Sequence, residues 1–127
     1  MARETYFPNP QNKPQGYSPA TKLGNIVFVS GQVSIDGDGN LVGEGDCGAQ
    51  SEQCFKNVGA GLAAAGATWE DVTKITAFLV NVDEYPAYAA ARLRRFPENG
   101  PASSSVIVKA LVSPSFLVEI EAIAVLQ

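Results

Sequence analysis

The stretch from Leu23 to Ile35, LGNIVFVSGQVSI, constrains the fold most, because its first half is apolar on both faces of an extended chain. Alternate side chains of a strand point to opposite sides, so Val27 and Val29 would face one way and Ile26 and Phe28 the other. A strand of this kind is typically covered on both sides. We therefore expect a central strand here.

The triplet Ser30-Gly31-Gln32 interrupts the apolar pattern. A glycine inside a strand marks either a bulge or a position where a ligand or another backbone comes close. Two hydrogen-bonding side chains, Ser30 and Gln32, flank this glycine. The triplet by itself leaves two interpretations open. One is an irregular strand end, which is the commoner case, and the other is the floor of a small-molecule site.

The composition limits the possible classes of function. The chain has 127 residues, of which 46% are hydrophobic and 17% charged, and this predicts one globular domain over residues 1–127. A net charge of -4 and a pI near 4.7 give no basic footprint for nucleic acid. No apolar run is long enough to span a membrane, and the N-terminus lacks the apolar core of a signal peptide. A cytoplasmic location is therefore expected.

The chain contains no histidine. This excludes Ser-His-Asp and Cys-His catalysis and zinc sites ligated by histidine. Cys47 and Cys54 fall in a predicted helix, where about 10.5 Å would separate their Cα atoms, which is too far for a disulfide. We expect two buried thiols, no metal site, and chemistry based on carboxylates, hydroxyls, Lys, Arg or backbone amides.

Two segments have the spacing of helices. Residues 46–65 repeat apolar side chains at helical intervals, and Gly66 then favours a helix end. A second helix is predicted to be capped by Asp83. Its expected buried stripe consists of Tyr85, Ala89, Leu93 and Phe96. The proline-rich segment 8–22 is expected to be an extended loop.

Further strands are expected at residues 74–82, 103–110 and 117–126. The order of elements predicts an α+β fold in which two helices pack on one face of a mixed sheet. Because the strands are apolar on both faces, the uncovered face must contact another surface. A second copy of the chain is the simplest candidate.

Glu119 and Glu121 share one face of the last predicted strand. Two carboxylates in this arrangement suit a general acid or a base that positions water. They also suit a solvated strand edge, and the pattern alone favours this second interpretation.

Several motifs occur together and in order along the chain. They are Tyr17-Ser18, GNIVFVSGQ at 24–32, Ala65-Gly66 followed by WEDV at 69–72, Pro101-Ala102, and VEIEAIA at 118–124. Together they resemble the RidA (YjgF/YER057c/UK114) family over nearly the whole chain. The resemblance implies a chorismate-mutase-like fold that assembles as a homotrimer. Its sheets would form a trimeric barrel, with a small-molecule ligand bound in the clefts between subunits.

Active members of that family hydrolyse enamines and imines, such as 2-aminoacrylate, to 2-oxo acids and ammonia without a metal or cofactor. The resemblance implies that Tyr17, Ser30 and Gly31 contribute to the ligand pocket. It also implies that Glu119 positions water, which makes Glu119 the candidate catalytic residue. Many members are called endoribonuclease L-PSP, but the acidic charge and missing histidine argue against cleavage of RNA here.

The chain departs from the family at the motif P-A-R-S, whose arginine grips the substrate carboxylate. Here residues 101–104 read P-A-S-S, so Ser103 replaces the arginine, and Ser105 replaces a family cysteine. A serine cannot supply the bidentate charged contact of arginine. The resemblance also places an asparagine of the family's second helix at Ala89. Arg92, three residues later on the same helix face, is our candidate for the missing charge.

Two classes of function remain. The first is a hydrolase whose enamine or imine substrates differ from the usual ones of the family, and in which Glu119 acts on water. Its substrate would be bound by Tyr17, Ser30, Gly31, Ser103, Ser105 and Arg92. The second is a non-catalytic homotrimer that binds a metabolite or a partner protein in the same clefts, because a family resemblance fixes fold more firmly than activity.

Overall fold

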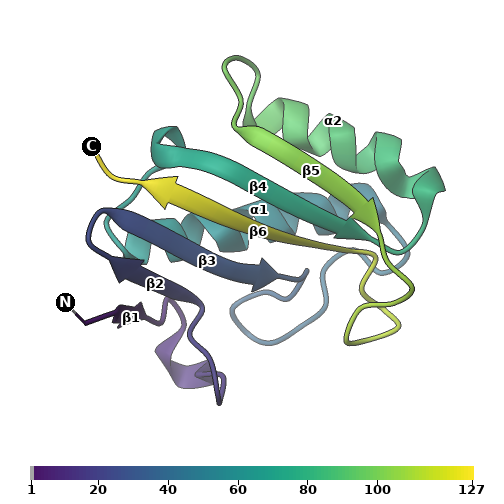
Figure 1. Cartoon of the computed structure of the whole chain (residues 1–127). Helices are drawn as coiled ribbons and strands as arrows, with labels where there is room; N and C mark the ends of the chain where they lie inside the picture. Colours follow the sequence, from purple (N-terminus) through teal and green to yellow (C-terminus); the bar gives the residue numbers. More distant parts are fainter. Residues whose placement is uncertain (1) are drawn as a thin grey trace.

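The computed structural model describes residues 2–127, which form one mixed sheet with two helices behind it (Figure 1). The strands are β1 (Glu4–Tyr6), β2 (Ala20–Leu23), β3 (Ile26–Gln32), β4 (Val72–Leu79), β5 (Ala102–Ile107) and β6 (Val118–Val125). The helices are α1 (Cys47–Ala64) and α2 (Tyr85–Arg95), with short 3-10 turns at Pro10–Asn12, Trp69–Asp71 and Val82–Glu84. The strand order is β1-β2-β3-β6-β4-β5, and only the β4–β5 pair is parallel in the described part of the chain. The predicted α+β fold is confirmed.

A tight turn divides the predicted central strand. Leu23 ends β2 and pairs with Ile26 at the start of β3, so Gly24 and Asn25 form a two-residue hairpin turn. Gly24 has a φ of 61°, which glycine adopts without strain. The expectation of an extended loop through Lys22 is therefore wrong at its end. The short strand β2 owes its structure to pairing with β1 and β3 rather than to a strong pattern of its own.

The core lies between the sheet and the helices. Asp46 caps α1 by accepting a hydrogen bond from the Ala49 N–H at 3.0 Å. Val58 and Leu62 of α1 are buried, as are the alternate residues Val118 and Ile120 of β6. Both cysteines are buried and free, as expected. Each large aliphatic side chain buried in this way contributes about 1.5–3 kcal/mol to stability.

Helix α2 buries a different face from the predicted one. Tyr88 and Ala91 are fully buried, whereas Leu93 is 64% exposed. Tyr88 stacks on Phe55 of α1 with 6.2 Å between ring centres, and this ring buries far more apolar area than the methyl group of Ala89 could. The cap also differs from the prediction. The Asn81 side chain accepts from the Asp83 N–H, and a 3-10 turn then precedes the helix.

One buried amide joins α1 to two loops. The Gln50 Nε2 donates to the carbonyl oxygens of Gly43 and Ser115, each at 3.0 Å, and its Oε1 accepts from the Leu117 N–H at 2.9 Å. Gln50 is fully buried, so these bonds replace the water that its amide would otherwise bind. They fix the chain immediately before β6 begins.

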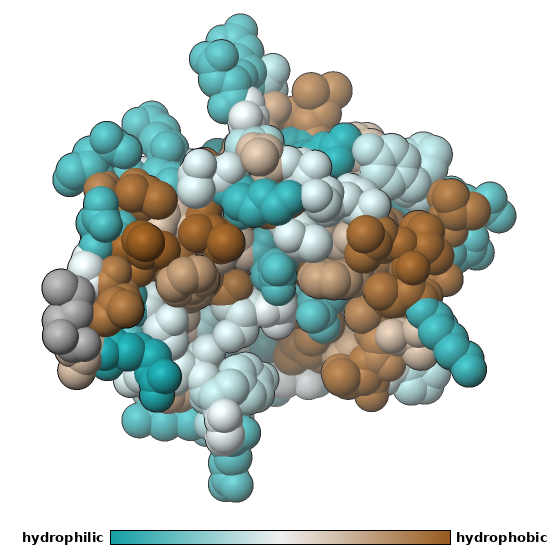
Figure 2. Space-filling model, viewed as in Figure 1, coloured by the Kyte–Doolittle hydropathy of each residue, from teal (hydrophilic) through white to brown (hydrophobic). Residues whose placement is uncertain are grey.

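The second face of the sheet has no cover within residues 2–127. Ile26 and Phe28 of β3 and Val106 of β5 are each 38–46% exposed. Figure 2 shows this face, on which two apolar areas lie on either side of a paler, more polar centre. We call it the open face. In residues 2–127 no helix has the length and apolar character needed to cross a membrane.

Candidate functional site

Glu119 lies on the open face of β6, against Gly31 of β3. Its neighbours Val118 and Ile120 are fully buried on the helix side, so the intervening carboxylate points to the opposite side. The β3–β6 pairing shifts register between Val29 and Gln32, which is a bulge. A Cβ at residue 31 would overlap the Glu119 carboxylate and lie 2.8 Å from its Cδ. The irregular strand end is therefore present, and the glycine leaves room for the Glu119 side chain. The small-molecule site stays a prediction.

The surroundings of Glu119 change its acidity. Burial raises the pKa of this carboxyl, and the negative charge of Glu121 raises that pKa further. No lysine or arginine among residues 2–127 forms an ion pair with it. A raised pKa brings proton uptake and release closer to neutral pH, which suits acid–base chemistry.

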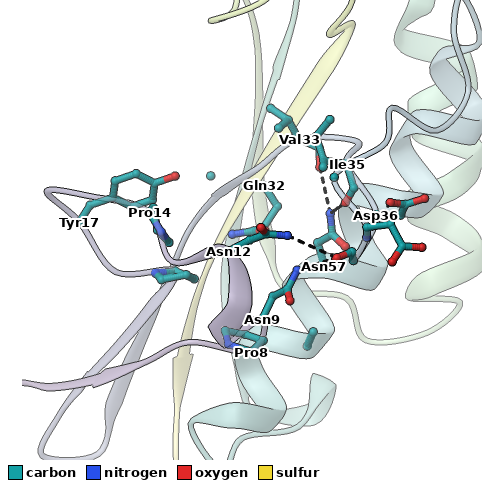
Figure 3. Close-up of a pocket in the computed structure, with 16 residues that line it drawn as sticks. Pro8, Asn9, Asn12, Pro14, Tyr17, Gln32, Val33, Ile35, Asp36 and Asn57 are labelled. Atoms are coloured by element: carbon teal, nitrogen blue, oxygen red, sulfur yellow. Dashed lines mark hydrogen bonds between the residues drawn. The ribbon is translucent and has the colours of Figure 1, made fainter.

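A cleft of about 470 Å³ opens on the other side of Gly31 (Figure 3). Its walls are residues 8–19 and the turn at 36–39, and its floor runs from Gly31 to Ile35. Asn9 joins the two walls, because its Nδ2 donates to the Gly37 carbonyl at 3.0 Å. Tyr17 lines the cleft and is 61% exposed. Tyr17 and Gly31 therefore line the same cleft, and the Gly31 backbone separates it from Glu119.

Ser30 holds the segment that carries Tyr17. Its hydroxyl donates to the Ser18 carbonyl at 2.6 Å, and its N–H donates to the Pro19 carbonyl at 2.9 Å. The hydroxyl proton of Ser30 is thus used within the protein and is not available to donate to a ligand. Its contribution to the site is to fix the position of Tyr17 beside β3.

Ser103 and Ser105 lie on the opposite side of the sheet from Glu119. In the β4–β5 pairing Ser103 is opposite Ile75 and Ser105 is opposite Ala77, and both partners are fully buried on the helix side. Glu119 pairs with Phe78, whose side chain shares the open face. Within one chain, the two serines and the glutamate therefore do not form a joint site.

Arg92 approaches Ser103 from α2. Both border a cavity of about 630 Å³ between α2 and β5. The Arg92 Nη2 donates to the Tyr85 hydroxyl at 2.9 Å, and its guanidinium carbon lies 5.3 Å from the ring centre of Tyr88. No carboxylate of residues 2–127 forms an ion pair with Arg92. A cation and a hydroxyl therefore meet at this cavity, and the cation lacks an internal counter-ion.

Comparisons with known proteins identify the family of this chain. The family model described as Endoribonuclease L-PSP matches residues 10–126. The chain belongs to this family, the RidA/YjgF proteins. It is 37% identical over 125 residues to a RutC family protein of Pyrococcus abyssi, and the match covers 98% of both chains. It has the same identity and coverage with an Acinetobacter baylyi protein named 3-aminoacrylate deaminase RutC.

The fold comparison supports the same assignment. The solved structure of a Rid family protein of unknown function from Yersinia pestis has a TM-score of 0.89 and 33% identity to this chain. That match covers 98% of this chain and all of the other. The expected family and fold are therefore confirmed for this RidA-family chain.

Sequence reasoning missed Tyr88 in this RidA-family chain. Its side chain is fully buried, and its hydroxyl is close enough to Arg92, Ser103 and Ser105 for all three to influence its pKa. The available signal was the spacing of Tyr85, Tyr88 and Arg92 at intervals of three and four, which places them along one helix face.

Proposed function

We propose that this RidA-family protein hydrolyses enamines or imines to a carbonyl compound and ammonia. The observation that carries the proposal is the half-buried Glu119 carboxylate, which has a raised pKa and lies against the Gly31 backbone. The relative named 3-aminoacrylate deaminase supports the reaction class. Cleavage of RNA is not favoured, because the chain carries a net charge of -4 and no histidine.

Glu119 has the chemistry that this reaction needs. An enamine first takes a proton from solvent on carbon and becomes an iminium ion. Water then attacks the iminium carbon and gives a proton to the Glu119 carboxylate, which yields a neutral carbinolamine. Glu119 passes that proton to the nitrogen, and the C–N bond breaks with its electron pair on nitrogen, which releases ammonia. The hydroxyl gives its proton to water as the carbonyl forms. Such proton transfers by a positioned side chain typically contribute 10²–10⁴-fold to a rate.

We propose that the complete site lies between two copies of the chain in a homotrimer. Glu119 lies on the open face and Tyr17 in the adjoining cleft, whereas Ser103 and Arg92 lie on the helix side of β5. β5 is an edge strand, so its residues are available to a neighbouring copy. One small ligand can contact both groups only if they come from different chains.

In this site Arg92 supplies the charge for the substrate carboxylate. The hydroxyl of Ser103 adds a hydrogen bond at the position where the family motif has an arginine. Each hydrogen bond to a charged group contributes roughly 1.5–3 kcal/mol to binding. The replacement of a bidentate arginine by the Ser103 hydroxyl therefore changes which carboxylates bind well. We therefore propose a substrate range that differs from that of the usual 2-imino acids.

A direct assay tests the reaction class. The protein is mixed with 2-iminopropionate, 3-aminoacrylate and several other imines and enamines generated in situ, and ammonia release is measured against buffer. We expect acceleration of at least one substrate. If none is accelerated and the clefts still bind small carboxylates, the non-catalytic binding function replaces the hydrolase.

The homotrimer is tested by placing a charge on the open face. Phe28→Glu should convert a trimer into a single chain of 13.4 kDa, because the carboxylate would otherwise be buried in an apolar interface. Analytical ultracentrifugation measures the mass. Val82→Glu is the matched control, since Val82 is 64% exposed in the turn before α2 and should leave the assembly intact. A wild-type protein that sediments as one chain would contradict the shared site.

A further inference from the structure

Two buried hydroxyls beneath the Arg92 cavity have no hydrogen-bond partner. They belong to Tyr88 and Ser105, and they are the only buried side-chain oxygen or nitrogen atoms without a partner among residues 2–127. An unpaired buried polar group costs about 1–3 kcal/mol. Both hydroxyls lie near the cavity that Arg92 borders, and Arg92 forms no ion pair within residues 2–127. Their unpaired state therefore points to a role in binding.

The hydrogen-bonding capacity of the neighbours limits what the Tyr88 hydroxyl can do. Burial raises the pKa of this phenol, although Arg92 and the two serines act in the opposite direction, so the phenol keeps its proton. Arg92 has only donors and cannot accept that proton. The hydroxyl oxygens of Ser103 and Ser105, which share the helix side of β5, are the neighbouring groups that could accept from the Tyr88 O–H, although neither does so in the ligand-free chain.

A serine that accepts from Tyr88 has its own proton left for another partner. Ser103 borders the cavity together with Arg92, whereas Tyr88 does not reach the cavity surface. In the ligand-free chain the Tyr88 hydroxyl forms no such bond. When a ligand accepts the Ser103 proton, the Ser103 oxygen is left free to accept from Tyr88. The guanidinium of Arg92, stacked on the Tyr88 ring, then presents its charge to the same space.

We propose that Tyr88 is a positioning residue that makes Ser103 and Arg92 joint donors to the carboxylate of a small ligand. The inference rests on the proposed function, because it describes the carboxylate-binding half of the same site. The selected ligand class is a small carboxylate, which accepts both hydrogen bonds and neutralises the cation. A neutral amide of the same shape has one acceptor oxygen in place of two and leaves the cation without a counter-ion.

Tyr88→Phe tests this role, because it keeps the ring that packs against Phe55 and Arg92 and removes only the hydroxyl. The probes are pyruvate and pyruvamide, whose dissociation constants are measured by NMR titration. We expect Tyr88→Phe to weaken pyruvate about 10-fold and pyruvamide less than about 2-fold. Tyr6→Phe is the control, since the Tyr6 hydroxyl bonds to Glu4 on the remote strand β1. It should change neither constant.

The outcomes separate this inference from the proposed function. Arg92→Gln should abolish the preference for pyruvate over pyruvamide. If it does and Tyr88→Phe leaves that preference intact, Tyr88 is only a packing residue and the proposed function stands. If the wild type shows no preference for pyruvate, the proposed carboxylate site and the role of Tyr88 are both overturned.

Folding of the variant is checked by thermal unfolding. Tyr88→Phe should not lower the unfolding temperature of the ligand-free protein, because the hydroxyl that it removes has no partner in that state. Ser103→Ala provides a second test that leaves the α1–α2 packing unchanged. It removes the donor that Tyr88 orients, so it should cause the same selective loss of pyruvate binding, and equal weakening of both probes would contradict the proposal.

Discussion

Replacement of Glu119 by glutamine should lower the rate constant of ammonia release by about 10²–10⁴-fold. Glutamine keeps the shape of the side chain but cannot take a proton from water. The affinity for substrate should change little, since the carboxylate-binding groups lie on the other side of the sheet. Steady-state kinetics with a coupled ammonia assay would report kcat and KM separately.

Glu121→Gln is the matched control for that experiment. Glu121 occupies the same face two residues further along β6, and its charge raises the pKa of Glu119. Its removal should preserve most of kcat and move the acidic limb of the pH–rate profile to lower pH. In the wild type the rate should fall as the pH decreases through the pKa of Glu119, because only the ionised carboxylate accepts a proton. Equal losses in both variants would argue against a specific role for Glu119.

The stability of the glutamine variant distinguishes catalysis from folding. Because the pKa of Glu119 is higher in the folded protein than its ordinary value, ionisation of this group opposes folding. That opposition is absent below the ordinary glutamate pKa and develops as the pH rises through the folded-state value. Glu119→Gln should therefore be at least as resistant to urea as the wild type at pH 7.

Gly31→Ala is the second substitution with a large expected effect, a loss of about 100-fold in the rate constant. The new methyl group would occupy the space of the Glu119 carboxylate and push it away from its position over β3. A displacement of about 1 Å in a reacting group can cost that much. Gly31 does not have a positive φ, so the backbone itself accepts alanine. The unfolding temperature should change far less than the rate.

Gly48→Ala is the control for the glycine, since Gly48 lies in α1 outside the cleft and a Cβ there makes only ordinary contacts of 3.4 Å or more. It should leave the rate unchanged. A crystal structure of the Gly31→Ala protein should show the Glu119 side chain in a different rotamer. Full activity of that variant would mean that the close contact between Glu119 and Gly31 has no part in the reaction.

The features predicted well from the sequence are those set by periodic burial. The alternation along β6 follows directly from Val118, Ile120, Ala122 and Ala124, and α1 follows from its apolar repeat. The main failures have local causes. The β2–β3 turn consists of only two residues, Gly24 and Asn25, between apolar residues on both sides, so the pattern resembles one continuous strand. The buried face of α2 is decided by the stacking of Tyr88 on Phe55.

The candidate site was less predictable, because it depends on register. That Glu119 reaches Gly31 requires the bulge between Val29 and Gln32, and no local pattern specifies that shift. The separation of Ser103 from Glu119 follows only when two strand pairings, β4–β5 and β4–β6, are known together. The family resemblance supplied the residues, and the sheet determines which of them one chain can bring together.

The amide of Gln50 has a consequence for how this scaffold can diversify. Gln50 holds Ser115 and Leu117 by hydrogen bonds, immediately before β6 begins. The loop before them includes Val112, which is 88% exposed, so a change in that loop should not shift β6. Residues inserted in that loop would change the surface of the molecule without changing the register of Glu119 in the sheet. The loop can therefore vary in sequence and length while Glu119 keeps its position.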